Sequence, residues 1–187
     1  MKTLFILVLI YISAGFTTAI EFKNEEKVVL LGNTFIERDV NFGHIETHLA
    51  LALSDKRPTF RNLGWSGDTV YCHARSYFGP PQEGFDRLKK HIQFLKPTLV
   101  LMCYGAVSSF DGEPGLGSFL EGYKRLMAMI RSNSGARIVL VSPPPCETLG
   151  FPLPDMEPQN KKLALYSEAI KKLAAEEDCD FVNLFEA

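Results

Sequence analysis

The sequence predicts an α/β fold, a three-layer α/β/α sandwich around a flavodoxin-like parallel five-stranded sheet in the order 2-1-3-4-5. Short apolar runs without alternation indicate strands that are buried on both faces. Segments with helical spacing separate these runs, as the right-handed crossovers of a parallel sheet require. The chain has 187 residues, 46% of them hydrophobic, which fits a single domain with a substantial core.

The first expected strand covers residues 28–31, four aliphatic residues that run into Gly32. It is too short for a helix and ends in glycine, which favours a buried strand. The other four expected strands are Thr59–Gly64 and residues 99–104, 137–142 and 181–184.

Four helices are expected between these strands. The first covers residues 41–54, where apolar side chains recur at helical spacing. Prolines at 80–81 open the second helix. Ser118 and Glu121 have the spacing of a capping box and predict the start of the third. The fourth is centred on residues 163–173.

Residues 1–19 have the pattern of a secretory signal peptide. Lys2 provides the positive start, residues 4–12 are apolar, and the segment ends in small residues at Ala19. An uncleaved membrane anchor is the alternative, but the apolar run is shorter than the roughly 20 residues that span a bilayer. We therefore expect cleavage after Ala19, an exported protein of residues 20–187, and no membrane span in that part.

Charge and cysteine spacing exclude several classes of function. The formal net charge of −2 provides no basic field for nucleic acid. Export would allow the four cysteines to form one or two disulfides, with three pairings for two bridges. None has metal-ligand or Cys-x-x-Cys spacing, and buried free thiols are favoured because three lie in or beside apolar segments. We expect no metal and no cofactor.

Polar clusters follow each of the first four expected strands. They occupy residues 33–34, 64–69, 105–112 and 142–147. Ligands of open parallel sheets bind beyond the carboxyl ends of the strands, so these clusters predict a site along that edge of the sheet.

These blocks resemble the SGNH (GDSL-type) hydrolase family. The resemblance rests on Gly32-Asn33-Thr34 after the first strand, on Asn62-Leu63-Gly64-Trp65-Ser66-Gly67-Asp68-Thr69, and on Tyr104-Gly105, and it extends from about Lys27 to the end. It implies the predicted sandwich fold, the hydrolysis of esters by acyl transfer, and a small ester or an acetylated carbohydrate as substrate.

The resemblance assigns catalytic roles to particular positions. Thr34 stands where the family has its nucleophilic serine, and Gly64 stands where a backbone N–H holds the oxyanion. Val107 replaces the asparagine that donates a further hydrogen bond, and no Asp-x-x-His block occurs before Ala187. The resemblance therefore implies an ester hydrolase with an incomplete catalytic set. The alternative is a non-catalytic exported module that binds a glycan or another ligand on the same fold.

Family members carry a further helix after the last strand, which covers the sheet. Its absence implies apolar surface beside Phe181, Val182 and Leu184, a surface prone to aggregation or open to a partner.

Several of these polar residues also have a structural interpretation. Thr34 and Glu37 have capping-box spacing, and Asn33 could cap a helix or donate to a ligand. Ser66 and Asp68 either form a plain turn or contact the substrate, and the sequence allows both interpretations. For Ser108 the alternatives are a loop and a ligand contact.

The four histidines are the candidates for the missing base or for a metal site. His44 and His48 are four residues apart on one expected helix, but no third ligand is evident. His73 lies near the polar edge and is the candidate for a substitute base. His91 lies among polar residues and is expected on a solvated face.

Overall fold

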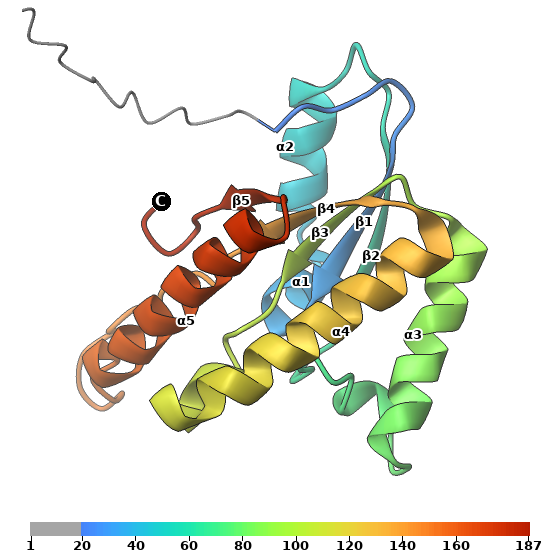
Figure 1. Cartoon of the computed structure of the whole chain (residues 1–187). Coiled ribbons are helices and arrows are strands. Elements are labelled where there is room, and N and C mark those ends of the chain that lie inside the picture. Colours follow the sequence, from blue (N-terminus) through green and yellow to red (C-terminus); the bar gives the residue numbers. More distant parts are fainter. Residues whose placement is uncertain (1–19) are drawn as a thin grey trace, which may run out of the picture.

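The computed structural model describes residues 20–187, so the predicted signal peptide lies outside the described residues. Five strands form one parallel sheet in the order β2-β1-β3-β4-β5, which confirms the predicted topology (Figure 1). The strands are β1 Lys27–Gly32, β2 Thr59–Gly64, β3 Leu99–Cys103, β4 Arg137–Val141 and β5 Asp180–Val182.

The helices lie on both sides of this sheet (Figure 1). They are α1 Thr34–Asp39, α2 His44–Ala52, α3 Pro81–Leu95, α4 Leu116–Ser134 and α5 Glu157–Glu176. Three short 3-10 helices complete the set: η1 Ala74–Ser76, η2 Ser108–Asp111 and η3 Glu113–Gly115.

The register of the sheet brings the polar loops to one edge. Gly32, the last residue of β1, lies opposite Gly64 of β2 and Cys103 of β3. Because all strands are parallel, the segments that follow β1, β2 and β3 leave the sheet side by side. The predicted clustering of residues 33–34, 64–69 and 105–112 is therefore correct.

Two predictions about helix starts were wrong. The helix expected over residues 41–54 is α2, which begins only at His44 because Gly43, with a φ of +66°, is its N-cap; residues 34–39, which precede the expected helix, form the separate helix α1. Helix α4 begins at Leu116, before the expected Ser118 cap, and the Ser118 side chain hydrogen-bonds with Tyr71 instead.

Each face of the sheet has its own hydrophobic cluster. Helices α3, α4 and α5 pack on one face, where Leu88, Leu126 and Tyr166 are fully buried. Helices α1 and α2 lie on the other face, against Val28, Leu30 and the rest of the second cluster. The core thus consists of two layers separated by the sheet.

All four cysteines are free in the structure. Cys72 and Cys103 are buried, and Cys146 and Cys179 are half-buried. Within residues 20–187, none of the helices is long and apolar enough to cross a membrane.

Candidate active site

Thr34 lies at the carboxyl end of β1, where the strand turns directly into α1. Gly32 permits this turn, because an added Cβ would lie 2.6 Å from the Cys103 carbonyl oxygen and 2.7 Å from Ile36 Cγ1. Asn33 caps α1, since its Oδ1 accepts the N–H of Phe35 at 3.4 Å. The tight turn leaves the side chain of Thr34 exposed at the edge of the sheet.

The Thr34 hydroxyl faces the loop that follows β2. Its Oγ1 accepts a hydrogen bond from the backbone N–H of Gly67 at 3.0 Å. Gly67 has a φ of +69°, and no atom lies within 4 Å of the position that a Cβ would take, so the space around it is open. A backbone donor next to an exposed hydroxyl is one component of an acyl-transfer site.

Gly64, where the resemblance places an oxyanion donor, has a hydrogen-bond partner within its own loop. The N–H of Gly64 donates to Asn62 Oδ1 at 2.8 Å, so this donor is already used inside the loop. Gly64 instead allows close packing, since an added Cβ would lie 2.7 Å from the carbonyl carbon of Ile36. Sequence reasoning missed Gly67, although a glycine between two polar residues in a turn is a signal for an exposed N–H.

The capping box expected from Thr34 and Glu37 does not form. Asn33 is the N-cap, and the Glu37 carboxylate accepts the Ser66 hydroxyl at 2.9 Å. Thr34 is therefore free of the capping role, and Ser66 ties the loop after β2 to α1. The Nδ2 of Asn33 is buried and has no hydrogen-bond partner among the described residues.

Asp68 is fully buried and does not reach the surface where a substrate would lie. Its Oδ2 accepts from Arg75 Nε at 2.6 Å and from the Tyr104 hydroxyl at 3.2 Å. Arg75 also donates to the Leu63 carbonyl oxygen at 2.6 Å. This buried cluster fixes the loop after β2 against the ends of β2 and β3, so the turn interpretation of Asp68 is supported.

Burial raises the pKa of the Asp68 carboxyl above its usual 3.8, and the Arg75 guanidinium opposes that rise. Arg75 was not singled out in the sequence, because a single arginine in a loop gives no sign that it is buried with a carboxylate.

The loop after β3 supplies Val107 and Ser108. Val107 precedes η2 and has no side-chain donor, as the sequence implies, and Ser108 is half-buried at the start of η2. The adjacent Ser109 is buried and donates to the Ala106 carbonyl oxygen at 2.8 Å. It also accepts from Gln159 of α5 at 2.7 Å, which anchors this loop.

None of the four histidines, all of them described, is hydrogen-bonded to Thr34. The Nδ1 of His73 lies 2.8 Å from Thr69 Oγ1. His44 and His48 are exposed on α2, and His91 is exposed on α3 as predicted. Within residues 20–187, no group of three or more His, Cys, Asp or Glu side chains is placed to hold a metal ion.

The buried thiols near the site are poor nucleophiles. Burial raises the pKa of Cys103, at the end of β3, to about 12. It does the same for Cys72, in the segment that follows the loop after β2. Since the thiolate is the reactive form, both remain protonated at neutral pH.

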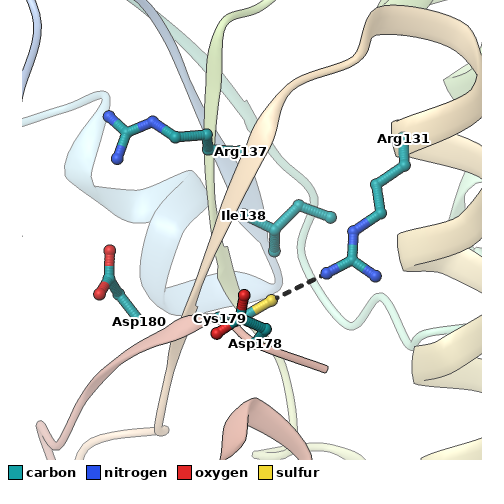
Figure 2. A pocket seen from close by; sticks show the side chains of 6 residues that line it. All are labelled: Arg131, Arg137, Ile138, Asp178, Cys179 and Asp180. Carbon is teal, nitrogen blue, oxygen red and sulfur yellow. Dashed lines mark hydrogen bonds between the residues drawn. The ribbon is translucent and has the colours of Figure 1, made fainter. Parts of the chain in front are cut away.

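A separate polar cavity of about 450 Å³ lies at the amino ends of β4 and β5, away from the carboxyl ends where Thr34 lies (Figure 2). Arg137 and Asp180, which line it, are the first residues of β4 and β5. Arg131 Nη2 lies 3.1 Å from Cys179 Sγ, and its Nη1 pairs with Glu177 at 2.8 Å. This cavity is not part of the site around Thr34.

Comparison with known proteins defines the family. Residues 36–187 match the GDSL-like Lipase/Acylhydrolase family, and the chain therefore belongs to it. The match begins two residues after Thr34, so it does not include the position predicted for the nucleophile. No curated protein sequence matches the chain.

Solved structures of related enzymes share the fold. A gut microbial diltiazem-metabolizing enzyme matches with a TM-score of 0.67 and 17% identity, over 90% of this chain and 39% of that one. A lipase/acylhydrolase from Enterococcus faecalis matches with a TM-score of 0.62 and 19% identity, over 86% and 77%. A carbohydrate acetylesterase family member from Sinorhizobium meliloti matches with a TM-score of 0.60 and 21% identity, over 84% and 82%.

Proposed function

We propose that this protein hydrolyses carboxylic esters and that Thr34 is the nucleophile. The observation that carries the proposal is the 3.0 Å hydrogen bond from the Gly67 N–H to the exposed Thr34 hydroxyl. Membership of the acylhydrolase family supports the reaction class. The acetylesterase among the structural neighbours makes an acetylated carbohydrate one candidate substrate and a small ester another.

The reaction proceeds by acyl transfer. Thr34 Oγ1 attacks the ester carbonyl carbon, the bond from that carbon to the alcohol oxygen breaks, and the hydroxyl proton leaves with the alcohol. Water then hydrolyses the acyl-threonine and releases the acid. The Gly67 N–H stabilises the negative charge that develops on Thr34 Oγ1 as its proton leaves.

Turnover is expected to be slow. Among the described residues, no base is hydrogen-bonded to Thr34, so water has to carry its proton to the departing alcohol. Val107 supplies no donor, and the loss of one oxyanion donor costs roughly 100- to 1,000-fold in turnover. The threonine methyl group also restricts χ1 and the approach to the carbonyl.

The second candidate function is ligand binding without turnover at the same edge of the sheet. It is favoured by the pairing of His73 with Thr69, which leaves the only histidine predicted near the edge engaged away from Thr34. We also propose that the protein is exported, on the basis of the signal-peptide pattern in residues 1–19.

Hydrolysis of p-nitrophenyl acetate tests the proposal. We expect Thr34→Ala to reduce the rate to that of buffer, because the nucleophile is removed. Thr34→Ser should increase the rate, because it keeps the hydroxyl and removes the methyl group. Thr47→Ala, which changes an exposed hydroxyl on α2, is the matched control and should retain the wild-type rate.

Labelling by an alkyl fluorophosphonate gives a second readout. Mass spectrometry should locate the adduct on Thr34. Equal rates for the wild type and Thr34→Ala, with no adduct at Thr34, would exclude this nucleophile and favour the ligand-binding alternative.

A further inference from the structure

The loop between β4 and α5 carries an apolar tip, residues 149–154, that is exposed to solvent. Leu149 is 68% exposed, Leu153 is 53% exposed, and Phe151 is fully exposed. The six residues of the apolar tip read Leu-Gly-Phe-Pro-Leu-Pro, so none of their side chains carries a hydrogen-bonding group. Single exposed apolar residues are normal, but three large ones within five residues indicate a surface that binds something.

Hydrogen bonds at the base of the loop hold the apolar tip in place. The side chain of Asn160, on α5, accepts from the N–H of Cys146 at 2.8 Å and donates to its carbonyl oxygen at 2.8 Å. Thr148 Oγ1 donates to the Asp155 carboxylate at 3.4 Å and accepts from the Met156 N–H at 3.1 Å. Because the base is closed in this way, the apolar tip loses less conformational entropy on binding than an open loop would.

The apolar tip belongs to the same end of the sheet as Thr34. Strand β4 ends at Val141, which pairs with Cys103 at the end of β3, and Cys103 also lies opposite Gly32 at the end of β1. The loop after β4 therefore leaves the sheet at its carboxyl edge, and its orange trace leads into the start of α5 (Figure 1). A partner of the apolar tip would meet the molecule at the end that holds the candidate site.

The backbone of the apolar tip suits a lipid environment. A backbone N–H that enters hydrocarbon without a hydrogen-bond partner is costly. Pro152 and Pro154 have no N–H, and the N–H of Leu153 donates to the Gly150 carbonyl oxygen at 2.9 Å. That bond closes a turn, so the apolar tip is not extended and does not offer the strand or polyproline conformation that peptide-binding proteins recognise.

Charge near the apolar tip favours a neutral lipid surface over an anionic one. Between Cys146 and Asn160 the chain has three carboxylates, Glu147, Asp155 and Glu157, and no lysine, arginine or histidine. Anionic headgroups attract basic segments and repel carboxylates. The headgroup of phosphatidylcholine has no net charge and accommodates such a loop.

We propose that the apolar tip inserts into the interface of a zwitterionic lipid bilayer and binds the protein to it peripherally. The removal of three large apolar side chains from water supplies the driving force, and no membrane-spanning helix is required. The carboxyl edge of the sheet then faces the bilayer. The proposal concerns docking and holds whether or not Thr34 hydrolyses an ester.

Quenching by brominated phosphatidylcholine vesicles tests the insertion. A tryptophan is introduced into the full chain by Phe151→Trp and, as the matched control, by Phe94→Trp. Phe94 is 84% exposed but lies at the other end of the sheet, beside Lys27 and Thr59, the first residues of β1 and β2. The vesicles should quench the new tryptophan of Phe151→Trp and shift its emission to the blue, and should leave that of Phe94→Trp unquenched. Trp65, common to all three chains, provides the background measured in the wild type.

Sedimentation with phosphatidylcholine vesicles measures the contribution of single side chains. Phe151→Ser should weaken partitioning by at least about tenfold, since one large apolar side chain is no longer buried in lipid. Leu149→Ser should act in the same direction, and Phe94→Ser should bind as the wild type does. All three positions are exposed, so the variants should unfold at the same urea concentration as the wild type. Added phosphatidylglycerol should weaken binding at low salt.

Several results would overturn the proposal. They are a Phe151→Trp tryptophan that brominated lipid does not quench, equal partitioning of the wild type and Phe151→Ser, and binding that strengthens as phosphatidylglycerol is added. Quenching of Phe94→Trp in place of Phe151→Trp would assign membrane binding to the opposite end of the molecule. A wild-type dimer that becomes a monomer in Phe151→Ser, without quenching by lipid, would assign the apolar tip to a second copy.

Thr34→Ala separates docking from the proposed reaction. It should bind vesicles as the wild type does, and loss of binding would mean that the site, rather than the apolar tip, holds the lipid. If the apolar tip inserts but Thr34→Ala hydrolyses p-nitrophenyl acetate as fast as the wild type, the nucleophile fails and the docking proposal remains. If Thr34 is essential for acetate hydrolysis but Phe151→Trp is not quenched, the docking proposal fails and the hydrolase proposal remains.

Discussion

The two faces of the sheet are built from the same strands but are covered differently. Along β1, Val29 and Leu31 point to the cluster under α3, α4 and α5, and Val28 and Leu30 point to the cluster under α1 and α2. The strands are thus apolar on both faces. The difference lies in the helices, since α4 buries seven residues, α1 buries one and α2 buries none.

The unequal covering of the two faces shows which parts of the site around Thr34 are held in place. The loop after β2 continues into Val70 and Cys72, which belong to the closed cluster under α3 to α5, and Arg75 holds it through Asp68. Thr34 begins α1, on the other face, where α1, α2 and strands β1, β3, β4 and β5 line an apolar groove of about 490 Å³. The Gly67 donor is therefore anchored on the side covered by α3 to α5, and the predicted nucleophile begins a helix of the less covered face.

The largest expected loss of stability comes from Arg75, on the closed face, which is the face of the sheet that α3, α4 and α5 cover. Arg75→Leu leaves the Asp68 carboxylate buried without its cation and should lower the free energy of unfolding by about 3–5 kcal/mol. Urea denaturation measures this loss. The matched control is Arg57→Leu, which breaks the exposed pair with Glu25 and should cost about 1 kcal/mol or less.

A double variant tests whether the cost comes from the unpaired charge. Asp68→Leu combined with Arg75→Leu removes both charges and should recover part of the stability lost in the single variant. If Arg75→Leu costs less than the Arg57→Leu control, the buried pair does not anchor the loop.

The next largest expected loss of stability comes from shortening a leucine to alanine, and it should differ between the two faces of the sheet. Leu126 of α4 is fully buried, so Leu126→Ala should lower the free energy of unfolding by about 2–5 kcal/mol, through lost burial and a cavity. Leu49 of α2 lines the open groove, where water already reaches one side of the residue, so Leu49→Ala should cost about 1 kcal/mol or less. Urea denaturation measures both variants under the same conditions.

Leu51→Ala, on the outer side of α2, is the control and should change stability by no more than about 0.5 kcal/mol. Equal losses for Leu49→Ala and Leu126→Ala would mean that the groove is filled or covered in solution.

The sheet could be predicted from the sequence because its signals are local. The apolar runs at 28–31 and 99–104 are each followed by glycine and polar residues, and their alternation with helical segments permits few topologies. The strand order and the shared polar edge follow from these patterns. The family resemblance then placed Thr34 at the end of β1.

The details of the site depend on contacts between distant segments. Gly67 is important because the loop after β2 folds back onto Thr34, and residue spacing does not reveal that the N–H of Gly64 is used by Asn62. The six residues of α1 are too few to show helical periodicity, so the helix start at Thr34 was missed. The apolar surface beside Val182 and Leu184 was expected from the family resemblance, but the groove that α1 and α2 form with it was not.

The smallest effect concerns the ion pair that joins α4 and α5 on the closed face. Lys124 Nζ lies 3.1 Å from Glu176 Oε2, with both side chains about half exposed. Lys124→Ala should lower the free energy of unfolding by only about 0.2–1 kcal/mol, because solvent screens the pair. At 1 M salt the difference from the wild type should shrink further, since the Debye length falls to about 3 Å. A loss as large as that of Leu126→Ala would mean that charge, rather than apolar burial, holds the helices on the closed face.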